Sequence, residues 1–223
     1  MSTRTSFLVS APLAAGALAL GARAAPAVAR ASPVAAASTV PPLAFDRAAF
    51  EAILSRPYRH KQVFATTSLH EGLVLHYMRN SLTAYAVGFG EGPGTMHVAA
   101  VTYGPALALA LDDGAWADLS LARYLETFGE KFGPELVPGK NPFADQVAAL
   151  VADGASFFVC NNALHGVANS LALLPFAGGR DTEAVYARMA RATLPGATIV
   201  PAGVAALNAA QEAHFTFVQA TVA

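Results

Sequence analysis

Apolar residues recur along this sequence in two patterns that alternate through most of the chain. Short apolar runs, such as ASFFVC at 155–160, have the length and the aromatic or β-branched content of buried strands. Apolar residues spaced three or four positions apart, as in 71–87, are typical of amphipathic helices. The pattern predicts strands at 62–69, 96–103, 106–111, 155–160, 197–200 and 215–219. It predicts helices at 46–54, 71–87, 121–128, 142–152, 163–174, 181–192 and 203–213, with Asp46 and Asp181 as N-caps.

This alternation of strand and helix predicts an α/β fold with a mostly parallel sheet that helices cover on both faces. The sequence contains no internal repeat and no sign of a second domain. Ligands of such sheets bind at the loops that follow the carboxyl ends of the strands. We therefore expect the chemistry of this protein in the loops at 67–71, 103–105 and 160–162.

The first 31 residues have the order of a signal peptide. Arg4 precedes an apolar stretch at 7–22, and small-x-small sites such as Ala-Arg-Ala at 29–31 follow it. The stretch is short and interrupted, which argues against a membrane span. We predict a signal peptide at 1–31, a linker rich in Ala, Pro, Ser and Val at 32–42, and one α/β domain at 43–223. The alternative is that the segment forms an apolar N-terminal helix of the fold.

The export route is left open by residues 3–8, TRTSFL. This segment resembles a twin-arginine signal, Ser/Thr-Arg-Arg-x-Phe-Leu, with Thr5 in the place of the second arginine. A twin-arginine-like signal and a general secretory signal are the two alternatives. Both lead to a periplasmic or secreted protein, and we expect no association with the membrane after cleavage.

Composition and charge narrow the function classes. Hydrophobic residues make up 54% of the chain and charged residues 13%, a composition that fills a core. The formal net charge is -1 and there is no basic run with interleaved aromatic residues, so we exclude nucleic-acid binding. One cysteine, Cys160, allows neither an intramolecular disulfide nor a cysteine-based zinc site. The six histidines have no strong metal-binding spacing, and we expect no metal and no cofactor.

Cys160 is the first candidate for chemistry because it ends a predicted strand and precedes a helix. The dipole of that helix would favour the thiolate form of the side chain. Asn161 and Asn162 follow directly and could donate hydrogen bonds to a sulfur anion. The alternative is a buried cysteine that acts as a small hydrophobic residue and never reacts.

Three further side chains fall near the carboxyl ends of predicted strands. His70 and His165 could stabilise a thiolate as cations, the alternative being that each is a solvated loop residue. Tyr103 begins the loop after the second strand and completes the predicted substrate-binding set of Asn161, Asn162, His70 and Tyr103.

Two well-known classes of site lack their motifs here. The glycine-rich run at 88–94 follows a helix and precedes a strand, which is the reverse of a phosphate-binding loop, so we interpret it as a flexible connection. No Gly-x-Ser-x-Gly elbow is present, which weakens a hydrolase interpretation.

Three segments of the chain together are typical of one protein family. The first is GASFFVCNNAL at 154–164, a strand, a cysteine and the start of a helix. The second is LPGATIVPAGV at 194–204, followed by Gln-Glu-Ala at 211–213, a closing strand and helix. The third is Asn141-Pro142, before the helix that leads into the cysteine strand. In these segments the chain resembles the DsrE/DsrF-like family of the sulfur-relay group, and the resemblance covers roughly 61–219.

The resemblance implies a flavodoxin-like α/β sandwich that assembles as a homo-oligomer, a trimer or a hexamer. In the relay members of the family, a cysteine at this strand end accepts sulfur as a persulfide, and that role carries over to Cys160 alone. The implied partner is a small sulfur species or a sulfur-carrier protein. This chain departs from the best-known relay members in its predicted export, in an insertion-like stretch at 119–139 and in the lack of a further cysteine.

Two functional hypotheses follow. The first is an exported protein that binds or relays sulfane sulfur through Cys160, in a cleft lined by Asn161, Asn162 and His70. The second is a non-catalytic periplasmic binding or assembly module that has the same fold and an inert cysteine. Whether the protein is an enzyme is left open, and the exposure of the Cys160 sulfur is the observation that discriminates best.

Overall fold

The computed structural model describes residues 45–132 and 137–220. These residues belong to one unit, Pro42–Ala223. The predicted signal peptide at 1–31 and the predicted linker at 32–42 lie outside the described residues.

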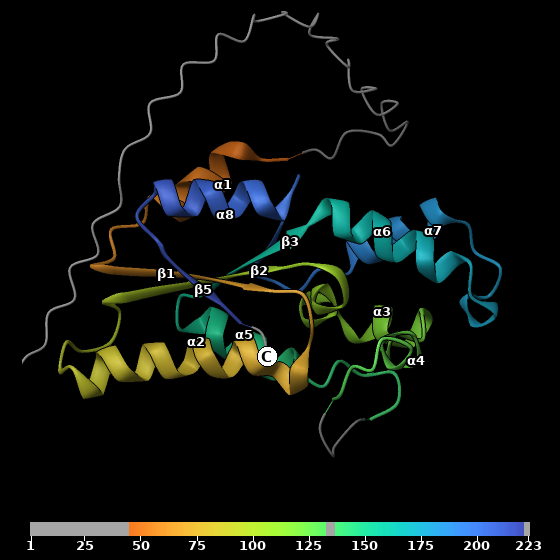
Figure 1. Cartoon of the computed structure of the whole chain (residues 1–223), viewed down its shortest axis with the longest axis horizontal. Helices are drawn as coiled ribbons and strands as arrows, with labels where there is room; N and C mark the ends of the chain where they lie inside the picture. Colours follow the sequence, from red (N-terminus) through yellow and green to blue (C-terminus); the bar gives the residue numbers. More distant parts are fainter. Residues whose placement is uncertain (1–44, 133–136, 221–223) are drawn as a thin grey trace, which may run out of the picture. The chain divides into compact units, whose positions relative to one another are not determined.

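Five parallel strands form a single sheet at the centre of this unit (Figure 1). The strands are β1 (His60–Thr66), β2 (Met96–Thr102), β3 (Ser156–Cys160), β4 (Ala197–Val200) and β5 (Thr216–Gln219). Their order is β4-β3-β2-β1-β5, and every neighbouring pair is parallel. The predicted flavodoxin-like α/β sandwich is thus confirmed, and the sheet is parallel throughout.

Helices cover both faces of the sheet. The elements are α1 (Arg47–Leu54), η1 (His70–Gly72), α2 (Leu73–Thr83), η2 (Ala84–Gly88), η3 (Gly104–Ala110), α3 (Asp113–Asp118), α4 (Leu121–Glu126), α5 (Ala144–Ala152), α6 (Asn161–Ala172), η4 (Pro175–Ala177), α7 (Thr182–Arg191) and α8 (Gly203–Glu212). Figure 1 shows α1 and α8 on one face, with α2 and α5 on the other. None of the helices in the described residues combines the length and apolarity that crossing a membrane requires.

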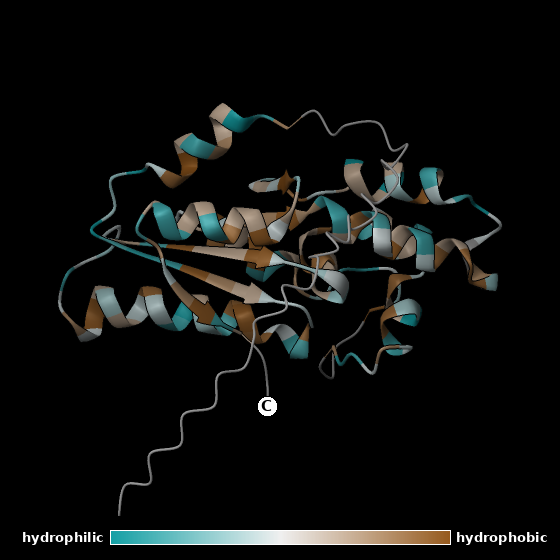
Figure 2. Cartoon of the chain, turned by 45° about the horizontal axis from the view of Figure 1, so that its top comes forward, coloured by the Kyte–Doolittle hydropathy of each residue, from teal (hydrophilic) through white to brown (hydrophobic). Residues whose placement is uncertain are grey.

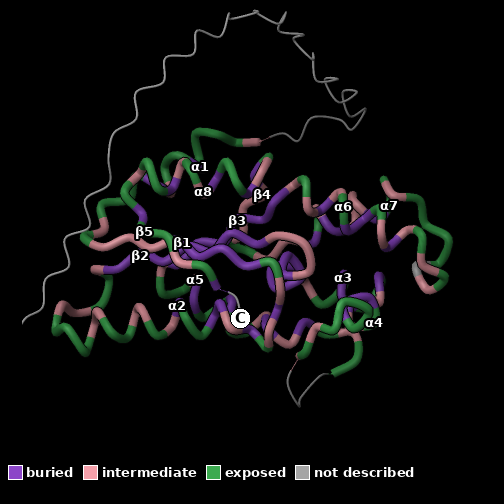
Figure 3. Tube along the Cα trace, viewed as in Figure 1, coloured by how far each residue is buried: buried purple, intermediate pink, exposed green. Residues whose placement is uncertain are grey.

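Side chains alternate between the two faces along each strand, as the period of two requires. Phe158 packs with α1 and α8, whereas its neighbours Phe157 and Val159 pack in the larger cluster on the opposite face. Every residue of β2 is buried (Figure 3), because β2 has a strand on each side and a helical layer on each face. Figure 2 shows the resulting pattern, with apolar strands enclosed and polar residues on the outer surfaces of the helices.

Most helix boundaries follow the predicted ones, and two of them have the predicted caps. The Asp46 carboxylate accepts a hydrogen bond from the Ala49 amide at 2.9 Å, at the start of α1. The Asp181 carboxylate accepts one from the Ala184 amide at 2.7 Å, at the start of α7. Both contacts satisfy amides that a helix leaves without partners in its first turn.

The strand predicted at 106–111 is wrong, because these residues form the 3-10 helix η3 and its end. The run ALALAL is buried from Ala106 to Leu111, and burial on all sides produces the same continuous apolarity in a short helix as in a strand. Asn141 holds this helix in place. Its side-chain amide donates to the carbonyl oxygens of Leu111 at 2.7 Å and Leu109 at 3.1 Å.

Asn141→Ala is expected to destabilise the fold by about 3 kcal/mol, because it leaves buried carbonyl groups without donors. The Asn141 side-chain oxygen also accepts a hydrogen bond from the Phe143 amide at 2.9 Å, which the substitution removes as well. Urea unfolding measures the change. Asn80→Ala, at an exposed position of α2, is the control and should change the unfolding free energy little. Equal stability of the two variants would contradict a clamping role for Asn141.

His97 lies on β2, within the sheet, and is fully buried. Its ring lies 4.8 Å from the Tyr58 ring and 5.1 Å from the Phe215 ring, measured between centroids. Its Nε2 atom and the Ser156 hydroxyl oxygen form a hydrogen bond of 3.0 Å. Burial, and then the positive charges of Arg56 and Lys61, lower the pKa of His97 to about 4. The ring is therefore neutral in the folded protein at neutral pH.

This lowered pKa predicts a loss of stability in acid. The unfolded chain binds a proton at His97 near pH 6.5 and the folded chain only near pH 4. The contribution of neutral His97 to the free energy of unfolding is therefore complete above pH 6.5. It is lost as the pH falls towards 4, by roughly 3 kcal/mol in total. Unfolding free energies measured across this range check it. His97→Gln should flatten the pH dependence, and an unchanged slope in that variant would refute the assignment.

Candidate functional site

Cys160 ends β3 at the carboxyl edge of the sheet, directly before α6. In the strand register it pairs with Val200 of β4. Its backbone is extended, so the side chain continues the alternation and lies on the face of Phe158, the face that α1 and α8 cover. Cys160 is 5% exposed. The position at a strand end agrees with the prediction, and the thiol is buried.

Tyr103 follows β2 at the same edge and lies beneath the first residue of α8. A Cβ atom at Gly203 would overlap the Tyr103 ring, so the absence of a side chain at Gly203 allows the ring to pack there. The phenol oxygen of Tyr103 is buried and has no hydrogen-bond partner among the described residues. Burial, and then the negative charge of a thiolate at Cys160, raise the pKa of Tyr103 to about 12. The phenol is therefore neutral at neutral pH and lies within electrostatic range of the Cys160 sulfur.

Asn161 and Asn162 begin α6, but their side chains have different surroundings. The Asn161 side-chain oxygen accepts a hydrogen bond from the Tyr186 hydroxyl at 2.8 Å, which turns this amide towards α7. Asn162 is exposed. Among the described residues, no hydrogen bond joins either side chain to Cys160. Their predicted role as donors to a sulfur anion stays a prediction.

His165 lies in the second turn of α6, stacked on Tyr186 with 3.7 Å between ring centroids and 12° between ring planes. Its Nε2 atom is buried and has no hydrogen-bond partner in the described part of the chain. The alternative that His165 is a solvated loop residue is therefore wrong, because it is a helix residue whose ring packs on Tyr186. The Tyr186 hydroxyl in turn donates a hydrogen bond to Asn161.

His70 lies in the loop after β1, where an acidic side chain from a distant part of the sequence fixes the backbone. The Glu130 carboxylate accepts hydrogen bonds from the Ser68 hydroxyl at 2.6 Å and from the Leu69 amide at 2.8 Å. The His70 amide points at the same carboxylate over a longer distance of 3.4 Å. No contact in the described residues joins the His70 ring to Cys160, so its predicted place in the cleft is untested.

Sequence reasoning missed Glu130, because no local pattern marks a residue that contacts a loop about sixty positions away. It lies in the stretch at 119–139 that the resemblance marks as an insertion. The structure shows that this stretch orders the carboxyl edge of β1.

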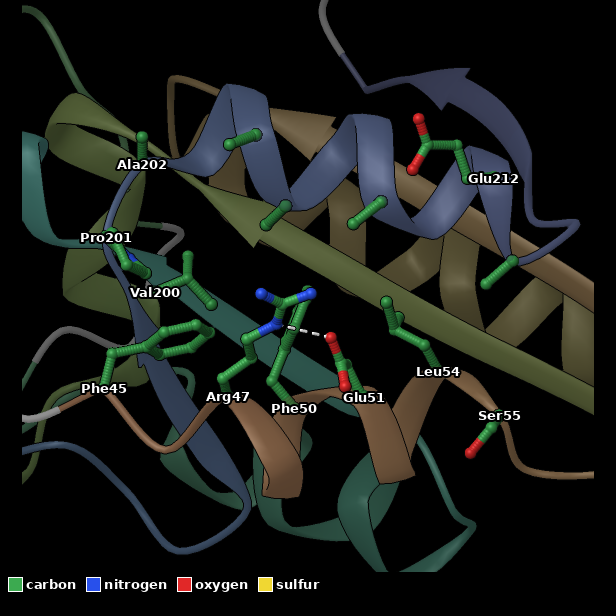
Figure 4. Close-up of a pocket in the computed structure, with 14 residues that line it drawn as sticks. Phe45, Arg47, Phe50, Glu51, Leu54, Ser55, Val200, Pro201, Ala202 and Glu212 are labelled. Carbon is green, nitrogen blue, oxygen red and sulfur yellow. Dashed lines mark hydrogen bonds and ion pairs between the residues drawn. The ribbon is translucent and has the colours of Figure 1, made fainter.

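The sequence also did not reveal a groove between α1 and α8 on the face to which Cys160 belongs (Figure 4). Its volume is about 560 Å³. Its walls are mostly apolar, and they include Phe45, Phe50, Leu54, Val200, Ala205 and Ala209. The signal that could have revealed it is the recurrence of alanine along one side of the predicted helix 203–213. A helix face of small residues leaves space where larger side chains would fill it.

The described residues contain no group of three His, Cys, Asp or Glu side chains arranged to hold a metal ion. At the carboxyl edge, the Cys160 thiol and the Tyr103 phenol are buried, the Asn161 amide binds Tyr186, and the Glu130 carboxylate binds the loop after β1.

Comparison with known proteins assigns this chain to no family. No protein-family model matches the sequence, and no curated protein matches it. Among solved structures, the chain is similar to MTH1491 from Methanobacterium thermoautotrophicum, a protein of unknown function. The identity is 16%, the match covers 72% of this chain and 98% of that one, and the TM-score is 0.41. The resemblance to the DsrE/DsrF-like family therefore stays a prediction from the residues quoted above.

Proposed function

We propose that this protein is exported and carries a sulfane sulfur atom as a persulfide on Cys160. The observation that supports this most directly is that the chain's one thiol lies within electrostatic range of the buried Tyr103 phenol, which has no hydrogen-bond partner among the described residues. Both groups lie at the carboxyl edge of the sheet. That edge is where ligands of parallel α/β sheets bind. The compartment follows from the predicted signal peptide, and a trimeric or hexameric assembly follows from the family resemblance.

The chemistry needs no oxidant. The Cys160 thiol loses its proton to solvent, and the thiolate attacks the outer sulfur of a donor such as thiosulfate. A new bond forms between the Cys160 sulfur and the transferred sulfur, while the sulfur–sulfur bond of thiosulfate breaks. Sulfite leaves with the electron pair. Transfer to an acceptor thiolate runs the same way, with the Cys160 thiolate as the leaving group.

The surroundings of Cys160 suit the anionic form of the product. Because the pKa of Tyr103 is about 12, its hydroxyl keeps its proton and can donate a hydrogen bond to a persulfide anion. The N-terminus of α6 lies next to Cys160, and its partial positive charge favours an anion there. Burial of the thiol would also limit its further oxidation outside the cytoplasm.

The alternative function is a non-catalytic binding or assembly module with an inert cysteine. The 5% exposure of Cys160 is the observation that favours it. Under this alternative, Cys160→Ser changes neither ligand binding nor phenotype. The two proposals therefore differ in whether sulfur can reach Cys160 in the native protein.

Intact-protein mass spectrometry after incubation with polysulfide or thiosulfate tests the proposed function. We expect the native protein to gain the mass of one sulfur atom, released by dithiothreitol, and Cys160→Ser to gain none, since Cys160 is the only cysteine. A native protein whose thiol reacts with iodoacetamide but gains no sulfur would contradict the relay function. A thiol that reacts with neither reagent until the protein unfolds would favour the alternative.

Tyr103→Phe tests the role of the phenol. The ring and its packing under Gly203 are retained while the hydrogen-bond donor is lost. We expect the rate of sulfur loading at Cys160 to fall about tenfold, as for a lost hydrogen bond to a charged group. The melting temperature should not fall, because the deleted hydroxyl has no partner among the described residues.

Tyr77→Phe is the matched control for that variant. It removes the hydroxyl of an exposed tyrosine on α2, on the opposite face of the sheet, and leaves the surroundings of Tyr103 intact. Its loading rate should equal that of the wild type. Equal rates in all three proteins would remove Tyr103 from the mechanism.

A further inference from the structure

The groove between α1 and α8 has the size and lining of a small-molecule site. Its volume of about 560 Å³ falls within the range of roughly 300–1,000 Å³ that such sites occupy. Phe50 and Leu54 rise from α1 towards α8, and Phe45 closes one end (Figure 4). The α8 wall is mostly alanine, with Glu212 at its end; Ala205 is exposed and Ala209 is half-buried.

The charged groups that line the groove already have partners. Arg47 and Glu51 form an exposed ion pair of 2.6 Å with each other. The Glu212 carboxylate accepts a hydrogen bond from the Asn208 amide at 2.8 Å. Apart from these three charged side chains and the Ser55 hydroxyl, the lining is apolar, and its alanine and phenylalanine surfaces suit a hydrocarbon chain.

The groove extends to the neighbourhood of Cys160. Val200 and the two residues after it line the groove, and Val200 is the strand partner of Cys160. Phe50 and Val200 also belong to the buried cluster against which Tyr103 packs. Cys160 itself does not line the groove, so the thiol lies behind the wall at its β4 end.

We propose that this groove binds the hydrocarbon part of an apolar organic persulfide or thiol that exchanges sulfur with Cys160. The inference rests on the proposed function and names its substrate class. In the loading step, the Cys160 thiolate attacks the outer sulfur of R–S–S⁻, so that a bond forms between the Cys160 sulfur and this outer sulfur while the sulfur–sulfur bond of R–S–S⁻ breaks. R–S⁻ leaves with the electron pair and takes up a proton from solvent. The groove selects an apolar R group over a charged one.

The chain-length dependence of thiol modification tests the proposal. Alkyl methanethiosulfonates, from methyl to hexyl, transfer an S-alkyl group to a thiolate and release methanesulfinate. Because Cys160 is the only cysteine, every product forms at that site. Relative to N-acetylcysteine, we expect the rate to rise with chain length, by up to about fourfold for each methylene that becomes fully buried.

A variant that fills the groove should abolish this rise. Ala209→Phe places a ring in the groove from the α8 side, and Ala205→Phe does so from a more exposed position if the first variant fails to fold. Val204→Phe, on the exposed part of α8 away from the lining, is the matched control and should keep the rise. Rates that stay flat or fall with chain length would overturn the proposal, as would a rise retained in folded Ala205→Phe or Ala209→Phe.

Binding to Cys160→Ser separates this inference from the proposed function. Hexyl methyl sulfone, which cannot react, should shift the amide resonances of α1 and α8 in that variant, and the groove-filling substitutions should abolish the shifts. If these shifts appear while the wild type gains no sulfur, the relay function fails and the groove assignment holds. If the wild type gains sulfur and no shifts appear, the groove assignment fails alone.

Discussion

The burial of a parallel sheet on both faces is the constraint on which the rest of this structure depends. Parallel strands need crossover connections, and the helices in those connections supply the two layers that keep the sheet from water. The fully buried β2 lies at the centre of this arrangement. Because every strand runs the same way, every strand ends at the same edge. Cys160 and Tyr103 lie at the same edge for this reason, although they are 57 positions apart in the sequence.

The two helical layers differ in the size of the side chains that pack against the sheet. On the side of α2 and α5, large side chains such as Met78, Trp116 and Phe157 fill the space between helix and sheet. On the other side, α8 presents glycine and alanine, as at Gly203 and Ala206. Small residues allow the Tyr103 ring to pack under the start of α8, and they leave the groove beside α1 open. The small residues of α8 thus account both for the packing of Tyr103 and for the groove.

Local patterns predicted the elements of this fold well, because their causes are local. The caps at Asp46 and Asp181 and the strand that ends at Cys160 are examples. The run at 106–111 was misassigned because complete burial removes the periodicity that separates helix from strand.

The contacts that shape the candidate site come from residues far apart in the sequence. Glu130 binds the loop after β1, and Tyr186 turns Asn161 away towards α7. A single sequence carries no signal for either contact. The same holds for the groove, which exists only because the chain brings α1 and α8 side by side (Figure 4).

The buried hydroxyl of Tyr103 bears on the choice between a reactive and an inert Cys160. Among the described residues this hydroxyl has no hydrogen-bond partner; such a group costs the folded state about 1–3 kcal/mol, and phenylalanine would fill the same space under Gly203 without that cost. If Cys160 is inert, the Tyr103 hydroxyl therefore only lowers the stability of the folded state. For a cysteine that carries an anionic sulfur, the same hydroxyl is a donor kept in its neutral form by burial and by the charge it would contact. We therefore propose that the Tyr103 hydroxyl serves the sulfur-carrying state, in which a persulfide anion on Cys160 would accept its hydrogen bond.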